Sequence, residues 1–168
     1  KIRSMPNATS MDMISAMGAS PVPMSASETY TALQQGVVDG AENTELALTV
    51  NGHEDLVASY TYTEHQYSPD IYIISTSTWN ELTDEQKDHL KKSLAKTNDN
   101  FKMKYNDMMA KAIEEAKLHG VKIYYDIDKT SLIESVKPIA AEFTRRGEEY
   151  QKLYDDVQKF GKVNGGSK

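Results

Sequence analysis

The sequence of 168 residues is 39% hydrophobic and 26% charged, a composition typical of a folded globular protein rather than of a disordered tail. Its formal net charge of −6 excludes nucleic-acid binding through a broadly basic face, so local groups must hold any anionic ligand. The absence of cysteine excludes disulfide bonds, thiolate zinc sites and cysteine nucleophiles, and no apolar run approaches the roughly 20 residues that cross a bilayer.

Strand and helix patterns alternate along the chain. In order, the sequence predicts short strands or extended segments at residues 2–5, 21–23, 37–38, 56–63, 71–75 and 121–125. It predicts helices that end at Gly18, that run from Ser25 to Gly36 and from Thr83 to Gly120, and a last helical region over 131–160 that is interrupted at Pro138. This alternation indicates the α/β class.

The helix predicted over 83–120 is the unusual element. Capping boxes, in which a Ser or Thr precedes a Glu or Gln by three residues, start this helix at Thr83 and an earlier one at Ser25. A helix of that length would reach about 50 Å, which is typical of an element that joins two lobes. The weak helix formers at 97–100 predict a bend at its middle.

Sequence motifs of catalysis and of metal binding are missing. The four histidines have no metal-ligand spacing, and there is neither a glycine-rich phosphate loop nor a G-x-S-x-G nucleophile motif. The sequence therefore predicts no catalytic residue, no metal and no cofactor.

Three segments together resemble the second half of the DctP-type solute receptors of TRAP transporters. They are the opening through Met17-Gly18-Ala19-Ser20-Pro21-Val22-Pro23-Met24, the block from Glu28 to Asn43 that contains Asp39-Gly40-Ala41-Glu42-Asn43, and Glu64-His65 leading into Ser68-Pro69-Asp70. The resemblance covers about residues 1–80 closely and the helical remainder loosely. The ordered block that ends at Asn43 is its most specific part.

The resemblance implies a two-lobed periplasmic-binding-protein-like α/β fold with a long helix that spans both lobes. The N-terminal part of the first lobe would be absent from this chain, and the opening at Lys1, without an initiator methionine, likewise suggests a fragment or a processed product. Residues 1–68 and 109–168 are expected to form the second lobe, and residues 69–108 to belong to the first.

The resemblance also implies a ligand-binding set of Arg3, Met24, Glu42, Asn43 and His65. A guanidinium offers parallel N–H groups to one carboxylate, so Arg3 is expected to pair with the carboxylate of the solute. Asn43 would add neutral donors, and His65 would belong to an adjacent polar network. At position 26 the family often carries an aromatic residue that can stack on the ligand, whereas this sequence has alanine.

The function implied by the resemblance is that of a periplasmic receptor that delivers a small organic carboxylate to the permease subunits of a TRAP transporter. A sugar acid such as a hexuronate is favoured, while C4-dicarboxylates, sialic acid and aromatic carboxylates remain open. The alternative is a fragment of a carbohydrate-acid enzyme with His65 as general base and Glu42 or Asp70 as the partner carboxylate.

Overall fold

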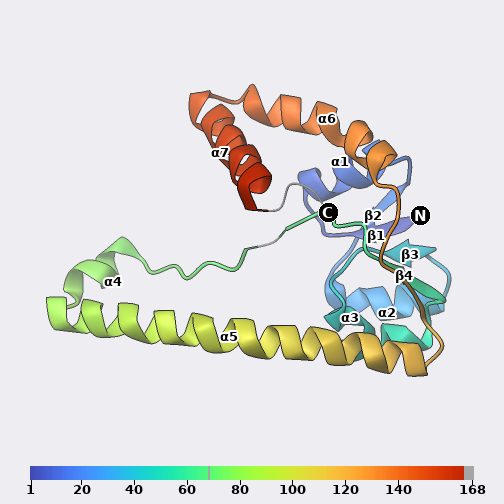
Figure 1. Cartoon of the computed structure of the whole chain (residues 1–168), viewed down its shortest axis with the longest axis horizontal. Helices are drawn as coiled ribbons and strands as arrows, with labels where there is room; N and C mark the ends of the chain where they lie inside the picture. The colour runs from blue at the N-terminus through green and yellow to red at the C-terminus, as the bar shows by residue number, and fades with distance from the viewer. Residues whose placement is uncertain (68, 165–168) are drawn as a thin grey trace. The chain divides into compact units, whose positions relative to one another are not determined.

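The computed structural model describes residues 1–67 and 69–164 of the chain. It divides into two compact units, one formed by Lys1–Glu42 with Ile127–Lys168 and the other by Asn43–Asp126. Figure 1 shows the elements of both units along the chain. Among the described residues, no helix is both long enough and apolar enough to cross a membrane. The division into lobes that the resemblance implies stays a prediction.

A small parallel sheet organises the first unit. Its strands are β1 (Ile2–Ser4), β2 (Pro21–Pro23) and β3 (Gly40–Ala41), in the order β2-β1-β3. Helix α1 (Ala8–Ala16) connects β1 to β2, and α2 (Ala26–Gln34) connects β2 to β3. The predicted strand at 37–38 is wrong, because the strand begins at Gly40. Val38 is nevertheless buried, with 2% of its surface exposed, while Val37 is 45% exposed.

Local sequence signals set the ends of these helices. The Asn7 side chain accepts a hydrogen bond from the Ser10 N–H at 2.9 Å at the start of α1. After α1, Gly18 adopts a left-handed backbone with φ of 89°, which explains the glycine there. At the start of α2, the Glu28 carboxylate accepts from the Ser25 N–H at 2.9 Å, as the capping box predicts.

Two helices complete the first unit, α6 (Thr130–Thr144), which packs against α1, and α7 (Glu148–Asn164), which packs against α6. The predicted interruption at Pro138 is wrong, because this proline lies inside α6. The helical region is divided instead between Thr144 and Glu148, where Gly147 disfavours helix. A proline removes one backbone hydrogen bond, which a helix packed on a neighbour tolerates.

The second unit is built on the long helix α5 (Asp84–Leu118). The chain first forms α3 (Leu46–Val50), the short 3-10 helix η1 (His53–Asp55), β4 (Ser59–Thr61) and α4 (Thr76–Glu81), and β5 (Lys122–Tyr124) follows α5. Strands β4 and β5 pair in parallel. The core contains Leu48, Ile113, Ala116 and Val121, with Val57, Tyr60, Tyr62 and Ile123 packed against it.

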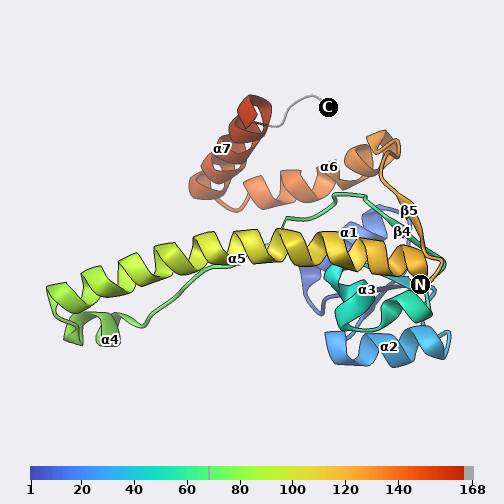
Figure 2. The ribbon, with the colours of Figure 1, turned by 60° about the horizontal axis from the view of Figure 1, so that its bottom comes forward.

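Helix α5 is 35 residues long and continues without a break through 97–100, where weak helix formers had predicted a bend. Thr83 caps its first turn as predicted, accepting from the Gln86 N–H at 3.2 Å. The buried residues of α5 all lie near its C-terminal end, at Ala112, Ile113 and Ala116. Figure 2 shows the remaining length of the helix extending away from α3, with α4 beside its first turns. Phe101 and Met103 on that length are 46% and 66% exposed.

The predicted strand at 71–75 is wrong for this chain. No strand is assigned to these residues, and Ile71 and Ile73 expose 78% and 87% of their surfaces. A strand exists only where a neighbouring strand accepts and donates its backbone hydrogen bonds. The β-type pattern of this segment therefore has no partner strand in the described part of the chain.

Candidate functional site

The carboxyl ends of the three parallel strands bring polar groups together. Arg3 lies on the central strand β1, and Met24 and Glu42 follow directly after β2 and β3. The chain runs from β1 to one edge of the sheet and then to the other, so the strand order reverses at β1. Ligands of open parallel sheets bind outside the carboxyl ends of the strands at such a reversal. The topology therefore predicts that a ligand binds beside Arg3.

The Arg3 side chain is buried, with only 4% of the residue exposed, and is held in one orientation. Its Nε and Nη2 donate to the carbonyl oxygen of Met24 at 3.2 and 3.0 Å. Its Nη1 lies 3.5 Å from Glu42 Oε1, a long ion pair between two largely buried side chains. A charged group in that position requires such partners, because desolvation of an unpaired guanidinium is costly.

These contacts use three of the five N–H groups of Arg3. The Met24 carbonyl engages the Nε side of the guanidinium, and one further N–H remains on each terminal nitrogen. Two such groups match the two oxygens of one carboxylate, which is the geometry that arginine recognises best. Because Met24 already fixes the plane of the guanidinium, little rotational freedom would be lost when an anion binds.

Asn43 follows Glu42 in sequence and belongs to the second unit. Its side-chain Oδ1 accepts from the Thr44 N–H at 2.8 Å, and its carbonyl oxygen accepts from the Tyr60 hydroxyl at 3.1 Å. With the amide oxygen engaged in this way, the NH₂ group is the part of the side chain available to donate. The half-buried Asn43 is thus oriented from both its backbone and its side chain.

A cluster of tyrosines, which the sequence pattern did not place near the site, supports Asn43. Tyr60 and Tyr62 meet edge to face at 5.2 Å between ring centroids, and Tyr62 stacks on Tyr125 at 5.1 Å. Burial raises the pKa of both Tyr60 and Tyr62, and the nearby Glu45 carboxylate raises each further. Alternate tyrosines on a strand usually indicate packing, which is why the pattern alone did not reveal this support.

His65 lies in the segment without regular secondary structure that follows β4. Glu64 adopts a left-handed conformation with φ of 50°, which is uncommon for a residue other than glycine. The His65 Nδ1 lies 2.5 Å from the Thr63 hydroxyl, so the ring is oriented by the residue two positions earlier. His65 therefore has a polar partner within the second unit, while its place beside the ligand stays a prediction.

The structure thus brings Arg3, Met24 and Glu42 together within the first unit. Asn43 and His65 lie in the second unit, and their participation in one binding site with Arg3 stays a prediction. Asp70, the other partner carboxylate of the enzyme alternative, is exposed.

Comparison with known proteins identifies the family. Residues 1–146 match the model of the bacterial extracellular solute-binding proteins, family 7, called DctP. The chain belongs to the DctP family. Among its relatives, the sialic acid-binding periplasmic protein SiaP of Vibrio cholerae is 33% identical over 126 residues, which cover 75% of this chain and 39% of SiaP. The description of this family is that of solute-binding proteins.

Solved structures of TRAP periplasmic solute binding proteins have the same fold. The protein from Anaerococcus prevotii, with bound D-glucuronate, is 33% identical with a TM-score of 0.89 over 97% of this chain and 53% of its own. The protein from Sulfitobacter sp. NAS-14.1, with bound β-D-galacturonate, is 27% identical with a TM-score of 0.84 over 92% and 51%. These structures confirm the predicted two-lobed α/β fold class. This DctP chain spans about half the length of the proteins that it matches.

Proposed function

We propose that this chain is part of a periplasmic receptor that binds a small organic carboxylate and delivers it to the permease of a TRAP transporter. The observation that carries this proposal is the buried, pre-oriented Arg3 at the carboxyl ends of the sheet. A guanidinium with one N–H remaining on each terminal nitrogen can donate to both oxygens of one carboxylate. Family membership and the bound ligands of similar structures support the same class of ligand.

Within this class, we propose a hexuronate-like sugar acid as the ligand. The structures from Anaerococcus prevotii and Sulfitobacter contain D-glucuronate and β-D-galacturonate, respectively. Arg3 would pair with the carboxylate of the sugar, and the NH₂ of Asn43 and the ring of His65 would donate to its other oxygens. Glu42 and the Met24 carbonyl would hold Arg3 in place, and Glu42 would also accept from a sugar hydroxyl.

The remainder of the receptor would supply the opposing side of the binding site. In this proposal, residues 1–68 and 109–168 belong to one lobe and residues 69–108 to the other. The ligand would favour the closed arrangement of the lobes through contacts that it makes with both of them at once. No chemical step is involved, so the bound acid would leave unchanged.

Calorimetric titration of the complete receptor with D-glucuronate, D-galacturonate, sialic acid and a C4-dicarboxylate tests the ligand. We expect the two hexuronates to bind most tightly and the other two acids at least about tenfold more weakly, a difference of about 1.4 kcal/mol. Tighter binding of sialic acid would contradict the assignment of a hexuronate as the ligand but would still agree with a receptor for small carboxylates. Mass spectrometry after incubation separates a receptor from an enzyme, because any conversion of the sugar acid would contradict the proposed function.

A further inference from the structure

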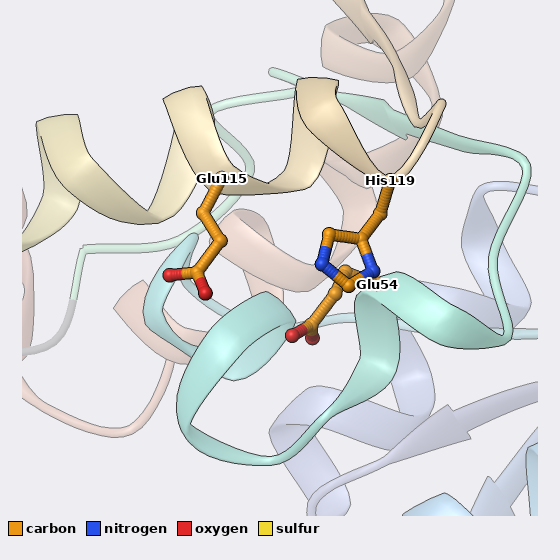
Figure 3. Close-up of side chains that lie close together, drawn as sticks. All are labelled: Glu54, Glu115 and His119. Atoms are coloured by element: carbon orange, nitrogen blue, oxygen red, sulfur yellow. The ribbon is translucent and has the colours of Figure 1, made fainter.

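A cluster of potential metal ligands lies in the second unit and takes no part in the proposed carboxylate site. Glu54 comes from η1, and Glu115 and His119 come from the last turns of α5. One ligand atom from each of the three side chains lies within 4.8 Å of the others. Figure 3 shows the two carboxylates and the imidazole directed into the same space between η1 and the helix.

The spacing of the histidines from one another does not reveal this cluster, because only one of its ligands is a histidine. Glu115 and His119 are four residues apart, so they lie on the same face of α5, one turn from each other. Glu54 is 61 positions earlier in the chain, and only the packing of α3 and η1 on α5 brings it there. A Glu-x-x-x-His pair near the end of a long helix is the signal that a search for metal sites could have used.

The His119 ring is oriented for coordination. Its Nδ1 lies 2.8 Å from Asp55 Oδ1, so in the neutral imidazole Nδ1–H donates to that carboxylate. The lone pair then resides on Nε2, and Figure 3 shows one ring nitrogen on the side of the Glu115 carboxylate and the other turned away. Carboxylates that fix the tautomer of a histidine ligand in this way are the usual support of metal-binding imidazoles.

Glu54 supplies an independent observation. Its Oε2 is a buried atom that has no hydrogen-bond partner in the described part of the chain. A carboxylate oxygen withdrawn from water without a partner is destabilising. In addition, one oxygen of the Glu115 carboxylate lies within 4.8 Å of one oxygen of Glu54. The neighbouring Lys117 does not offset this charge, because its ammonium group pairs with Glu114 at 2.9 Å. A bound cation would satisfy Glu54 and remove the repulsion.

We propose that Glu54, Glu115 and His119 bind a divalent transition-metal ion of the Zn²⁺ class. One imidazole nitrogen and two carboxylate oxygens are a ligand set that such ions accept, with water completing the coordination. In a tetrahedral zinc site the ligand atoms lie about 3.4 Å apart, so atoms that now lie within 4.8 Å of one another must approach by at most about 1.4 Å. Glu115 is an exposed side chain and can rotate to do so, while Asp55 holds the His119 ring. The ion would fasten η1 to the C-terminal end of α5.

Calorimetric titration of the metal-stripped, untagged complete receptor with ZnCl₂ tests the site. We expect a one-to-one complex with a dissociation constant of about 10 µM or below. His119→Gln and Glu115→Gln should each weaken binding at least about tenfold, and Asp55→Asn by a similar or smaller factor, since outer partners of metal ligands contribute about 10- to 100-fold. His89→Gln is the matched control, because His89 is an exposed histidine on the same helix outside the cluster.

Two further measurements keep the proposal falsifiable. Titration with Co²⁺ should give a visible absorption band that His119→Gln abolishes and His89→Gln retains. Zn²⁺ should raise the melting temperature of the wild-type protein but not that of His119→Gln. Wild-type affinity weaker than about 100 µM, equal losses in His89→Gln and His119→Gln, or equally tight Ca²⁺ binding that His119→Gln leaves unchanged would each overturn the proposal.

Discussion

A carboxylate that leaves water for a protein interior loses its hydration, and a well-aimed cation must offset that loss. We propose that Arg3 provides this cation, so we expect Arg3→Ala to weaken binding of the cognate acid by about 2–5 kcal/mol, or roughly 30- to 5,000-fold. Arg3→Lys should also bind poorly, because an ammonium group cannot reproduce the paired N–H geometry. Calorimetric titration of both variants of the complete receptor measures the effect.

Arg3 also donates to the Met24 carbonyl, so loss of binding must be separated from loss of fold. Circular dichroism and the melting temperature of Arg3→Ala provide that control. If a folded Arg3→Ala variant bound the acid within about threefold of wild type, the change in binding free energy would be less than about 1 kcal/mol. The proposed pairing of Arg3 with the carboxylate would then be wrong.

Asn43 is expected to contribute less than Arg3, because it donates without a charge. Asn43→Ala should cost about 1–3 kcal/mol in binding free energy, and His65→Ala should have the smallest effect of the three variants. Asn43→Asp is a sharper test, since it keeps an oxygen for the Thr44 N–H but replaces the NH₂ donor with negative charge. Calorimetry should therefore show weaker binding for Asn43→Asp than for Asn43→Ala, and the reverse order would remove Asn43 from the site.

The raised pKa values of Tyr60 and Tyr62 predict how the stability of the second unit depends on pH. Unfolded tyrosines release their protons near pH 10, while these two hold theirs to higher pH in the folded protein. The stabilisation is therefore fully present below about pH 10 and is lost as the pH rises toward the folded-state values. Urea unfolding at pH 8 and pH 11 should show this loss, and Tyr62→Phe should show a smaller one.

At the scale of the element, the predictions that succeeded were those with a local cause. Ser25 and Thr83 start helices because each is followed three residues later by a side chain that reaches back to its N–H. The failures concern tertiary context. Pro138 is tolerated inside a packed helix, and residues 71–75 find no neighbouring strand. In the same way, the sequence suggested Arg3 through resemblance, whereas its orientation by the Met24 carbonyl depends on the pairing of β1 with β2.

The long helix α5 should be stabilised unevenly along its length. Ile113 is 6% exposed and contacts the core of the second unit, so Ile113→Ala should lower the free energy of unfolding by about 2–5 kcal/mol. Met103 on the same helix is 66% exposed, and Met103→Ala should change the free energy of unfolding by about 0.5 kcal/mol or less. Urea denaturation of the chain, at a concentration where light scattering shows it to be monomeric, measures both values. Similar losses for the two variants would contradict this difference in packing.

At the scale of the whole molecule, four consecutive large side chains of the described residues expose apolar surface. Ile71, Tyr72, Ile73 and Ile74 are 78%, 59%, 87% and 44% exposed. Contiguous apolar patches of this kind mark surfaces that other parts of a protein cover. Since the chain spans about half the length of its relatives, we propose that the remainder of the receptor covers residues 71–74 with a neighbouring strand.

This proposal predicts opposite effects of one substitution in two molecules. Ile73→Glu should reduce self-association of the chain by itself, because it places a charge in an exposed β-prone segment. In the complete receptor the same substitution should destabilise by at least about 1.5–3 kcal/mol, the contribution of one buried isoleucine side chain. Val50→Glu, at a position that is 67% exposed in the second unit, is the control and should change neither property strongly. Light scattering of the chain and thermal unfolding of the receptor measure the two effects. A chain that stays monomeric and stable by itself, together with a receptor that tolerates Ile73→Glu, would show that residues 71–74 face solvent in the functional protein.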